Sequence, residues 1–367
     1  MKFICQRADL IKSINIALRA VSPRTTMPIL SCILVQAFDN GIFFQTNDME
    51  LCMETKLAGT VIEQGVIAID AKLFSEIARK LPEEEVILST NERNQILIVS
   101  GTARLNIPGQ DGDEFPVMPE VRREDGILIS QYTLKNVINQ TIFCTLPQDN
   151  NLMLTGELLE VRGDQFRLVA LDGHRIAIRR TLLHDETNPK SVIVPGKALS
   201  ELSKILTGEV GDLVTIFITT NHIVFQLEDT LMISTLISGK YFAVDKMVSS
   251  DHETMVVVNR QKLIGCIDRA ALFVRENDKK PIIFDITDNV MNLSIDSPIG
   301  AFSEDLSIAK EGRDLLIGFN PKLIIEALKA VEEEEVTLYF INAKSPCSIR
   351  DLEETYTYLV LPVNFTR

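Results

Sequence analysis

The chain has 367 residues, of which 46% are hydrophobic and 24% charged, a balance typical of a soluble globular protein with two or three domains. With 37 Lys and Arg against 51 Asp and Glu, its net charge of -14 argues against a chain that coats nucleic acid or an anionic membrane. No run of about 18 apolar residues is present, so no membrane-spanning segment is expected.

The predicted elements alternate between amphipathic helices and short strands. Period-3.6 patterns predict helices, and period-2 patterns predict antiparallel strands. In chain order they are a helix over 7–21, strands over 41–57, a helix over 71–81, a strand over 94–101, a helix over 131–145, strands over 165–183, a helix over 195–206, a strand over 222–229, a helix over 259–273, a strand over 290–297 and a helix over 320–331.

Three segments, 67–88, 192–214 and 316–338, repeat one pattern of strand, turn, amphipathic helix, polar turn and strand. Their helices align without gaps at a period of 125 residues. A basic–acidic–basic triplet at i, i+4 and i+7 recurs on one face of each helix. The three triplets are Lys72, Glu76 and Arg79; Lys197, Glu201 and Lys204; and Lys322, Glu326 and Lys329.

The repeat predicts an α+β fold made of three copies of one domain, each with two helices and about eight strands. Charged or polar stretches mark the seams, which gives predicted domains over 1–121, 127–248 and 254–367. Three tandem domains with unrelated roles are the alternative. Core packing alone, however, does not require the repeated charges on the helix faces.

The six predicted helices hold 14 Lys and Arg but only 5 Asp and Glu, although the whole chain is acidic. If all six face one way, they form a positive stripe for phosphates without reading sequence. A ring of twelve helices at about 10 Å spacing leaves roughly 28 Å inside, enough for a duplex, whereas six helices do not. Two chains could therefore enclose DNA.

Several segments together resemble the bacterial sliding clamp family, the beta subunits of DNA polymerase III. They are RTTMPIL (24–30), NDMEL (47–51), DEFPVMP (113–119), LDGHRIAI (171–178), VIVP (192–195) and YLVLPV (358–363). The resemblance implies three clamp domains per chain, each with two helices and two antiparallel sheets. It also implies a head-to-tail homodimer ring that encircles duplex DNA as a processivity factor, without catalytic activity or cofactor. Polymerase, clamp loader and repair proteins would bind through short linear motifs.

The resemblance also assigns residues to sites. Its DNA contacts comprise Arg24 and Gln148, to which the helix pattern adds Lys72, Arg79, Lys197, Lys204, Lys322 and Lys329. Its partner-peptide cleft comprises Leu154, Leu171, Gly173, His174, Arg175, Ile176, Phe242, Lys246, Met247, Pro346, Val360, Leu361, Pro362 and Val363. Its dimer seam comprises Leu105 and Ile107 against Leu272 and Phe273.

This chain departs from the family in two places. It reads GKYFAVDKMV over 239–248, where clamps usually carry a stretch like Phe-Pro-Asp-Tyr, so the cleft wall is altered. Leu152 and Met153 stand where the family's example has two tyrosines near the DNA. For Leu272 and Phe273, ordinary core positions are an equal alternative.

Two other classes of function compete with a clamp. Asp172, His174 and Arg175 could suggest an acid–base cluster, but no nucleophile motif and no Gly-rich phosphate loop accompany them. A peptide-binding scaffold that never touches DNA would explain the cleft but not the basic helices.

Six widely spaced cysteines show no paired spacing, which is typical of reduced, buried thiols rather than of a disulfide or zinc framework. Arg7 and Asp9 interrupt any apolar signal core. A cytoplasmic location without metal is therefore expected.

Overall fold

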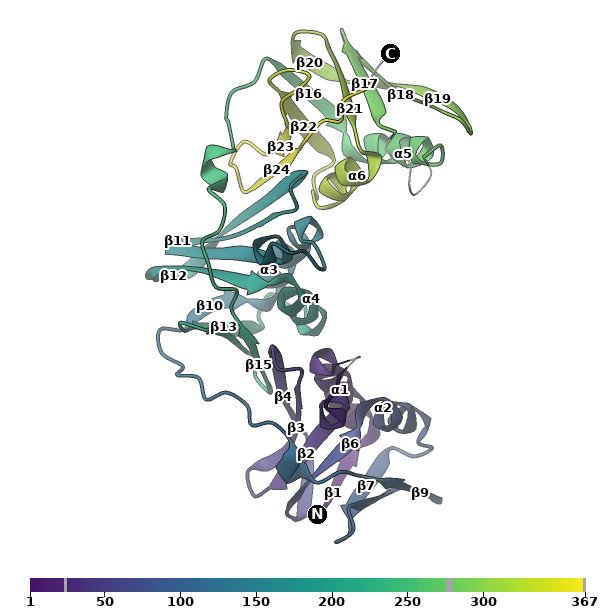
Figure 1. The fold of residues 1–367 in the computed structure, drawn as a ribbon, viewed down its shortest axis with the longest axis vertical. Coiled ribbons are helices and arrows are strands. Elements are labelled where there is room, and N and C mark those ends of the chain that lie inside the picture. Colours follow the sequence, from purple (N-terminus) through teal and green to yellow (C-terminus); the bar gives the residue numbers. More distant parts are fainter. Residues whose placement is uncertain (23–24, 275–279, 366–367) are drawn as a thin grey trace. The chain divides into compact units, whose positions relative to one another are not determined.

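The computed structural model describes residues 1–22, 25–274 and 280–365. The described α-helices fall at the six predicted places (Figure 1). They are α1 (Arg7–Ala17), α2 (Ala71–Lys80), α3 (Gln131–Asn139), α4 (Gly196–Ile205), α5 (Arg260–Ala271) and α6 (Pro321–Lys329). None of these described helices is long and apolar enough to cross a membrane.

Side-chain caps explain where the helices begin. The Asp70 carboxylate accepts a hydrogen bond from the Leu73 N–H at the start of α2, at 2.8 Å. The Asn320 side chain accepts one from the Lys322 N–H at the start of α6, at 3.0 Å. Each cap satisfies a main-chain donor that the first helical turn leaves without a partner.

The described residues form two compact units, 1–132 with 204–236 and 133–203 with 237–367. The first unit contains two antiparallel sheets. One has the order β5 (Gly59–Glu63), β1 (Lys2–Gln6), β7 (Glu85–Thr90), β8 (Gln95–Ser100) and β9 (Ala103–Pro108). The other has the order β10 (Ile127–Ser130), β13 (Leu213–Ile218), β14 (His222–Gln226), β15 (Thr230–Thr235), β4 (Leu51–Leu57), β3 (Gly41–Asn47), β2 (Cys32–Phe38) and β6 (Gly65–Asp70).

The second unit also contains two antiparallel sheets. One has the order β11 (Gly156–Leu171), β12 (Arg175–Pro195), β24 (Tyr356–Val360), β23 (Cys347–Arg350), β22 (Glu335–Phe340), β16 (Thr254–Asn259) and β20 (Ala309–Gly312). The other has the order β19 (Gly300–Ser307), β18 (Val290–Ser297), β17 (Ile282–Thr287) and β21 (Leu315–Phe319).

The sheets do not separate along the sequence repeat. Strand β15 of the second repeat pairs with β4 of the first, and β12 of the second pairs with β24 of the third. Each repeat contributes strands to two antiparallel sheets, and two of the described sheets are shared between neighbouring repeats. Hydrogen bonding across a repeat boundary stabilises both neighbours at once.

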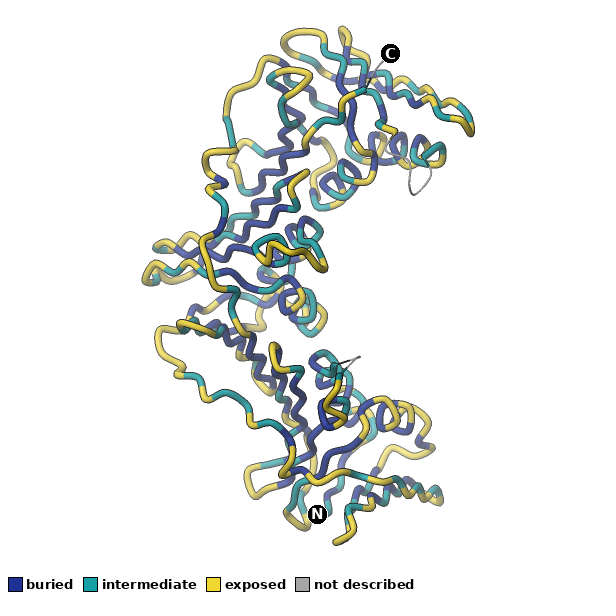
Figure 2. Tube along the Cα trace, in the orientation of Figure 1, coloured by how far each residue is buried: buried dark blue, intermediate teal, exposed yellow. Residues whose placement is uncertain are grey.

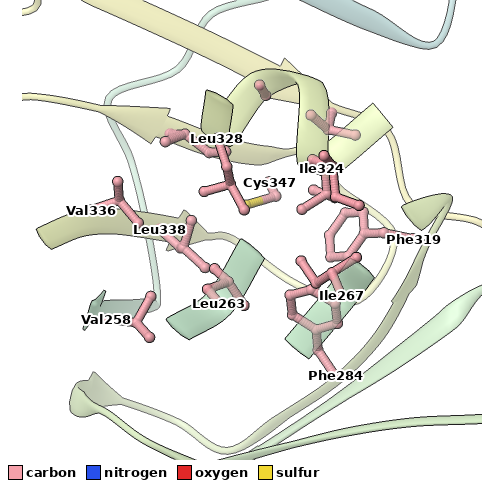
Figure 3. Close-up of a cluster of buried hydrophobic side chains, with 14 of the residues drawn as sticks. Val258, Leu263, Ile267, Phe284, Phe319, Ile324, Leu328, Val336, Leu338 and Cys347 are labelled. Carbon is pink, nitrogen blue, oxygen red and sulfur yellow. The ribbon is translucent and has the colours of Figure 1, made fainter. Parts of the chain in front are cut away.

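The largest core cluster lies in the second unit, beneath α5 and α6. Leu263 and Ile267 of α5 lie in one cluster with Ile324 and Leu328 of α6, and Phe284 lies beside Ile267 (Figure 3). All six cysteines are buried and none forms a disulfide, as the sequence predicted. Burial raises the pKa of Cys5 and of Cys52 to about 12, so both thiols stay protonated at neutral pH.

One carboxyl group is also enclosed. Glu157 of β11 is completely buried, and the Thr141 hydroxyl donates a hydrogen bond of 2.6 Å to its Oε2. Burial raises the pKa of Glu157 from 4.5 to about 8, because the charged form loses its hydration. The carboxyl is therefore largely neutral at pH 7.

We expect Glu157 to make stability depend on pH. An unfolded glutamate has the lower pKa, so folding takes up a proton between about pH 4.5 and 8. The free energy of unfolding should therefore fall as the pH rises through that window. Glu157→Gln should remove this decline. Between pH 5 and pH 8 the original chain should therefore lose at least about 1 kcal/mol more of its free energy of unfolding than the variant does. Thermal melts at both pH values measure it. The exposed Glu76→Gln is the control, and an unchanged pH slope in Glu157→Gln would contradict the assignment.

Candidate functional site

The basic residues of the three triplets are all exposed on the outer face of their helices. On α2 the side chains of Phe74 and Ala78 are buried, whereas Lys72 and Arg79 are exposed. The same alternation recurs on α4 and α6, where Lys197, Lys204, Lys322 and Lys329 are exposed (Figure 2). Each of these helices thus presents two cations seven residues apart and buries its opposite face.

The acidic members of the triplets differ. Glu76 is exposed, whereas Glu201 and Glu326 are half-buried. Glu326 of α6 forms an ion pair with the Nη1 of Arg175, a residue that lies at the start of β12. Alignment of the triplets treats the three glutamates as equivalent, but the third one also holds a strand in place.

The remaining predicted DNA contacts lie in loops. Gln148 is exposed in the turn after α3, and Leu152 is exposed at the start of a short 3-10 helix, Leu152–Thr155. The Asn151 side chain accepts a hydrogen bond from the Met153 N–H at 3.2 Å, which fixes the beginning of that helix. Arg24 lies outside the described residues.

The predicted partner-site residues gather around the turn between β11 and β12. The β24 strand pairs with β12 there, and the Leu361 N–H donates to the His174 carbonyl at 2.9 Å. A cluster of apolar side chains lies beside this turn, with Leu171 and Val244 buried and Leu154, Ile176 and Phe242 half-buried. The predicted residues from three parts of the sequence therefore share one place in the second unit.

The rim of this cluster is apolar and exposed. Met247 is 50% exposed and Leu361 is 41% exposed, while Pro346, Pro362 and Val363 are half-buried. Lys246 and His174 are exposed beside them. Exposed apolar side chains next to a few polar groups are typical of a surface that binds another protein or a peptide.

Three predicted residues are buried. Val360 is fully buried in β24, Leu171 is 5% exposed and Arg175 is 8% exposed. The Arg175 guanidinium contacts the Asp172 carboxylate at 2.9 Å, the Glu326 carboxylate and the Phe143 carbonyl, and it lies 5.1 Å from the centre of the Phe143 ring. Arg175 thus fixes the turn from behind rather than facing a ligand.

The Asp172 carboxylate is occupied by structure and has no free role as an acid or base. It accepts hydrogen bonds from the His174 N–H at 2.9 Å and the Arg175 N–H at 3.1 Å, besides the Arg175 ion pair. Gly173 adopts a φ of 88°, which the tight turn requires and most side chains disfavour. The described residues contain no group of three or more His, Cys, Asp or Glu side chains arranged to hold a metal.

The predicted seam residues lie at sheet edges and a helix end. Leu105 and Ile107 are half-buried in β9, the last strand of its sheet. Leu272, just after α5, is 76% exposed, so it is not a core residue. Phe273 instead packs on the core, with its ring centre 6.2 Å from that of Phe302 in β19.

Sequence reasoning missed a pocket of 330 Å³ on the β11–β12 hairpin. Arg167, Arg180, Phe166 and Leu182 are among its lining residues. The signal was the arginine-rich stretch around 175–180, but its opposition to Arg167 depends on strand register.

Sequence profiles of the DNA polymerase III beta subunit match almost the whole chain. The N-terminal, central and C-terminal domain profiles match residues 1–119, 128–242 and 246–364. The beta sliding clamp of Staphylococcus epidermidis is 35% identical over 374 residues, with 99% of each chain covered.

Solved structures agree with the profiles. The DNA polymerase sliding clamp of Bacillus subtilis superimposes with a TM-score of 0.96 at 34% identity, and a chain from Eubacterium rectale crystallised as a candidate DNA polymerase III beta subunit does so with a TM-score of 0.96 at 51% identity. Both comparisons cover 100% of each chain.

Proposed function

Because this chain belongs to the DNA polymerase III beta subunits, the sliding clamps that serve as non-enzymatic processivity factors in DNA replication, we propose that two copies close head to tail into a ring around duplex DNA. The chain would divide into clamp domains 1–121, 127–248 and 254–367. It would act in the cytoplasm, beside the chromosome. No cofactor is required for this function.

The observation that carries the proposal is the repeated exposure of paired cations on α2, α4 and α6 in a chain with a net charge of -14. Long, flexible lysine and arginine side chains make weak, exchangeable contacts with phosphate, often through water. Such contacts let a ring slide. The acidic remainder of the surface repels DNA, so binding is confined to the basic helices.

Two sheet edges support a head-to-tail closure. The β9 strand ends one sheet and β19 ends another, and each free edge can pair with a strand from a second chain. Joining β9 of one copy to β19 of the next would bring Leu105 and Ile107 near Leu272. Such a contact is heterologous, so it yields a closed assembly only when the rotation returns to the start, here after two copies.

The apolar cluster beside the β11–β12 turn supports binding of partner proteins. We assign it to the short linear motifs of the replicative polymerase, the clamp loader and repair proteins. Leu154, Ile176, Met247 and Leu361 would contact the apolar motif residues, and His174 would orient a polar one. The altered stretch still gives the cluster an apolar wall, because the Phe242 ring packs against it. The ring also lies edge-on to Tyr241, with the two ring centres 5.5 Å apart.

Retention on DNA tests the encircling function. A ring loaded on circular DNA by a clamp loader should remain bound in salt that removes simple phosphate binders, whereas the same ring on linear DNA should slide off the ends. Gel filtration of loaded DNA before and after a single double-strand cut measures this. Equal retention on circular and linear DNA would overturn the proposal. It would instead favour a scaffold that binds peptides without enclosing DNA.

A further inference from the structure

The pocket on the β11–β12 hairpin is lined by arginines and by apolar residues, among them Phe166 and Leu182. Its volume is 330 Å³. Leu182 is 68% exposed, whereas Phe166 is fully buried. Side chains on alternate residues of a strand share a face, so Arg180 and Leu182 lie on the same face as Ile178 of the partner-site cluster.

Two arginines stand directly opposite each other in this pocket. Arg167 of β11 pairs in register with Arg180 of β12. Like charges at directly opposed positions of an antiparallel pair destabilise the sheet unless other groups compensate them.

Arg167 is fully compensated. Its Nε donates to Glu160 Oε2 at 2.6 Å, and its Nη1 donates to Asp245 Oδ1 at 2.8 Å. Those two carboxylates therefore hold the Arg167 guanidinium in place through direct contacts.

Arg180 is not compensated in the same way. Its Nη1 donates to the main-chain carbonyl of Glu354 at 2.8 Å, and within the described chain no carboxylate forms an ion pair with it. The carboxylate of Glu354 lies 3.7 Å from Arg350 instead. Burial and the neighbouring Arg167 charge lower the pKa of Arg180, and they outweigh the opposing effect of Glu354, Asp245 and Asp351, none of which contacts the guanidinium as an ion pair.

We propose that this pocket, defined by Arg167, Arg180, Phe166 and Leu182, is a second docking site that takes a carboxylate side chain from an acidic, extended segment of a partner protein. The carboxylate pairs with Arg180, and the aliphatic part of the segment packs on Leu182. This inference rests on the proposed partner function and extends it to residues outside the linear motif.

Continuity with the partner site supports this occupant. Asp245, which anchors Arg167, directly precedes Lys246 and Met247 at the rim of the partner site. A partner chain bound there can continue over the same face toward Arg180. Glu353 and Glu354 line the pocket and disfavour a polyanion, so a single carboxylate fits better than a DNA backbone.

The experiment compares five peptides that share one apolar-and-Gln clamp motif. One is the motif alone, and the other four carry four glutamates or four glutamines at either the N-terminal or the C-terminal end. In at least one orientation, the glutamate version should bind the original chain about fivefold more tightly than the glutamine version at low salt, and added salt should reduce the difference. Fluorescence anisotropy gives the dissociation constants.

Arg180→Gln should abolish the advantage of the glutamate version while leaving binding of the motif alone unchanged. Arg180→Lys should retain part of the advantage, and the exposed Arg313→Gln should retain all of it, with thermal melts confirming that each variant folds. Equal affinity of the glutamate and glutamine versions for the original chain in both orientations would overturn the docking site. Loss of DNA retention in Arg180→Gln without any effect on peptides would assign the pocket to phosphate instead. Failure of the motif alone to bind would count against the partner function itself.

Discussion

Replacing Leu272 with aspartate is expected to turn the proposed dimer into a monomer. Leu272 is 76% exposed in the single chain, and we place it against β9 of the neighbouring copy. A carboxylate in that seam would be buried without a counter-charge, which costs about 3–5 kcal/mol. The dissociation constant of the dimer should therefore rise by at least about a hundredfold. Sedimentation velocity across a concentration series measures the change.

Leu272 is a sharper choice than the adjacent Phe273. Phe273 packs against Phe302 and the core, so changing it would unfold part of the third repeat and confuse the result. Leu352→Asp is the matched control, because Leu352 is 94% exposed in a turn far along the chain from either predicted edge. If Leu272→Asp still sediments as a dimer, the seam lies elsewhere.

Glu326→Gln is expected to weaken binding of a clamp-motif peptide about tenfold, although Glu326 belongs to a helix assigned to DNA. Arg175 is 8% exposed, and contacts with Glu326, Asp172 and the Phe143 carbonyl stabilise its buried positive charge. Without Glu326, the guanidinium must move or draw water inward, which would shift the turn that holds His174. Isothermal titration with the peptide measures the effect.

The control is Glu76→Gln, the same triplet position in the first repeat. It removes an equal charge but should leave peptide affinity unchanged. A double variant that combines Glu326→Gln with Arg175→Gln should bind the peptide as well as Arg175→Gln alone does, because both changes remove the same ion pair. Additive losses, or full affinity in Glu326→Gln, would show that the ion pair does not position the partner site.

The sequence predicted the helices and their exposed cations well, because both depend on local periodicity. The exposure of Lys72 and Arg79 follows from the burial of Phe74 and Ala78 on the other face, which a 3.6-residue period determines. The DNA-contact, partner-site and seam assignments themselves remain predictions. Of their described residues, Leu171, Arg175 and Val360 are buried and Phe273 packs on the core, whereas the cations predicted to contact DNA are exposed.

Features that depend on long-range register could not be predicted. The opposition of Arg167 and Arg180 follows from a hairpin with irregular pairing between Val161 and Gln165, where one residue of slip would move Arg180 to the other face. Likewise, Arg175 reaches Glu326 only because β12 pairs with β24. No local pattern contains such information.

The shared sheets have a consequence for how the chain is made. The β24 strand, Tyr356–Val360, is the last strand that the structure describes, yet it lies between β12 and β23. A ribosome delivers the N-terminal residues first, so β12 is made long before this partner strand. A nascent chain that stalls before Tyr356 therefore carries unpaired strand edges that a chaperone or protease can recognise. It also lacks Leu361 beside His174. The proposed partner site is complete only after β24 and Leu361 have been made, so a chain that stalls earlier would not compete for replication partners.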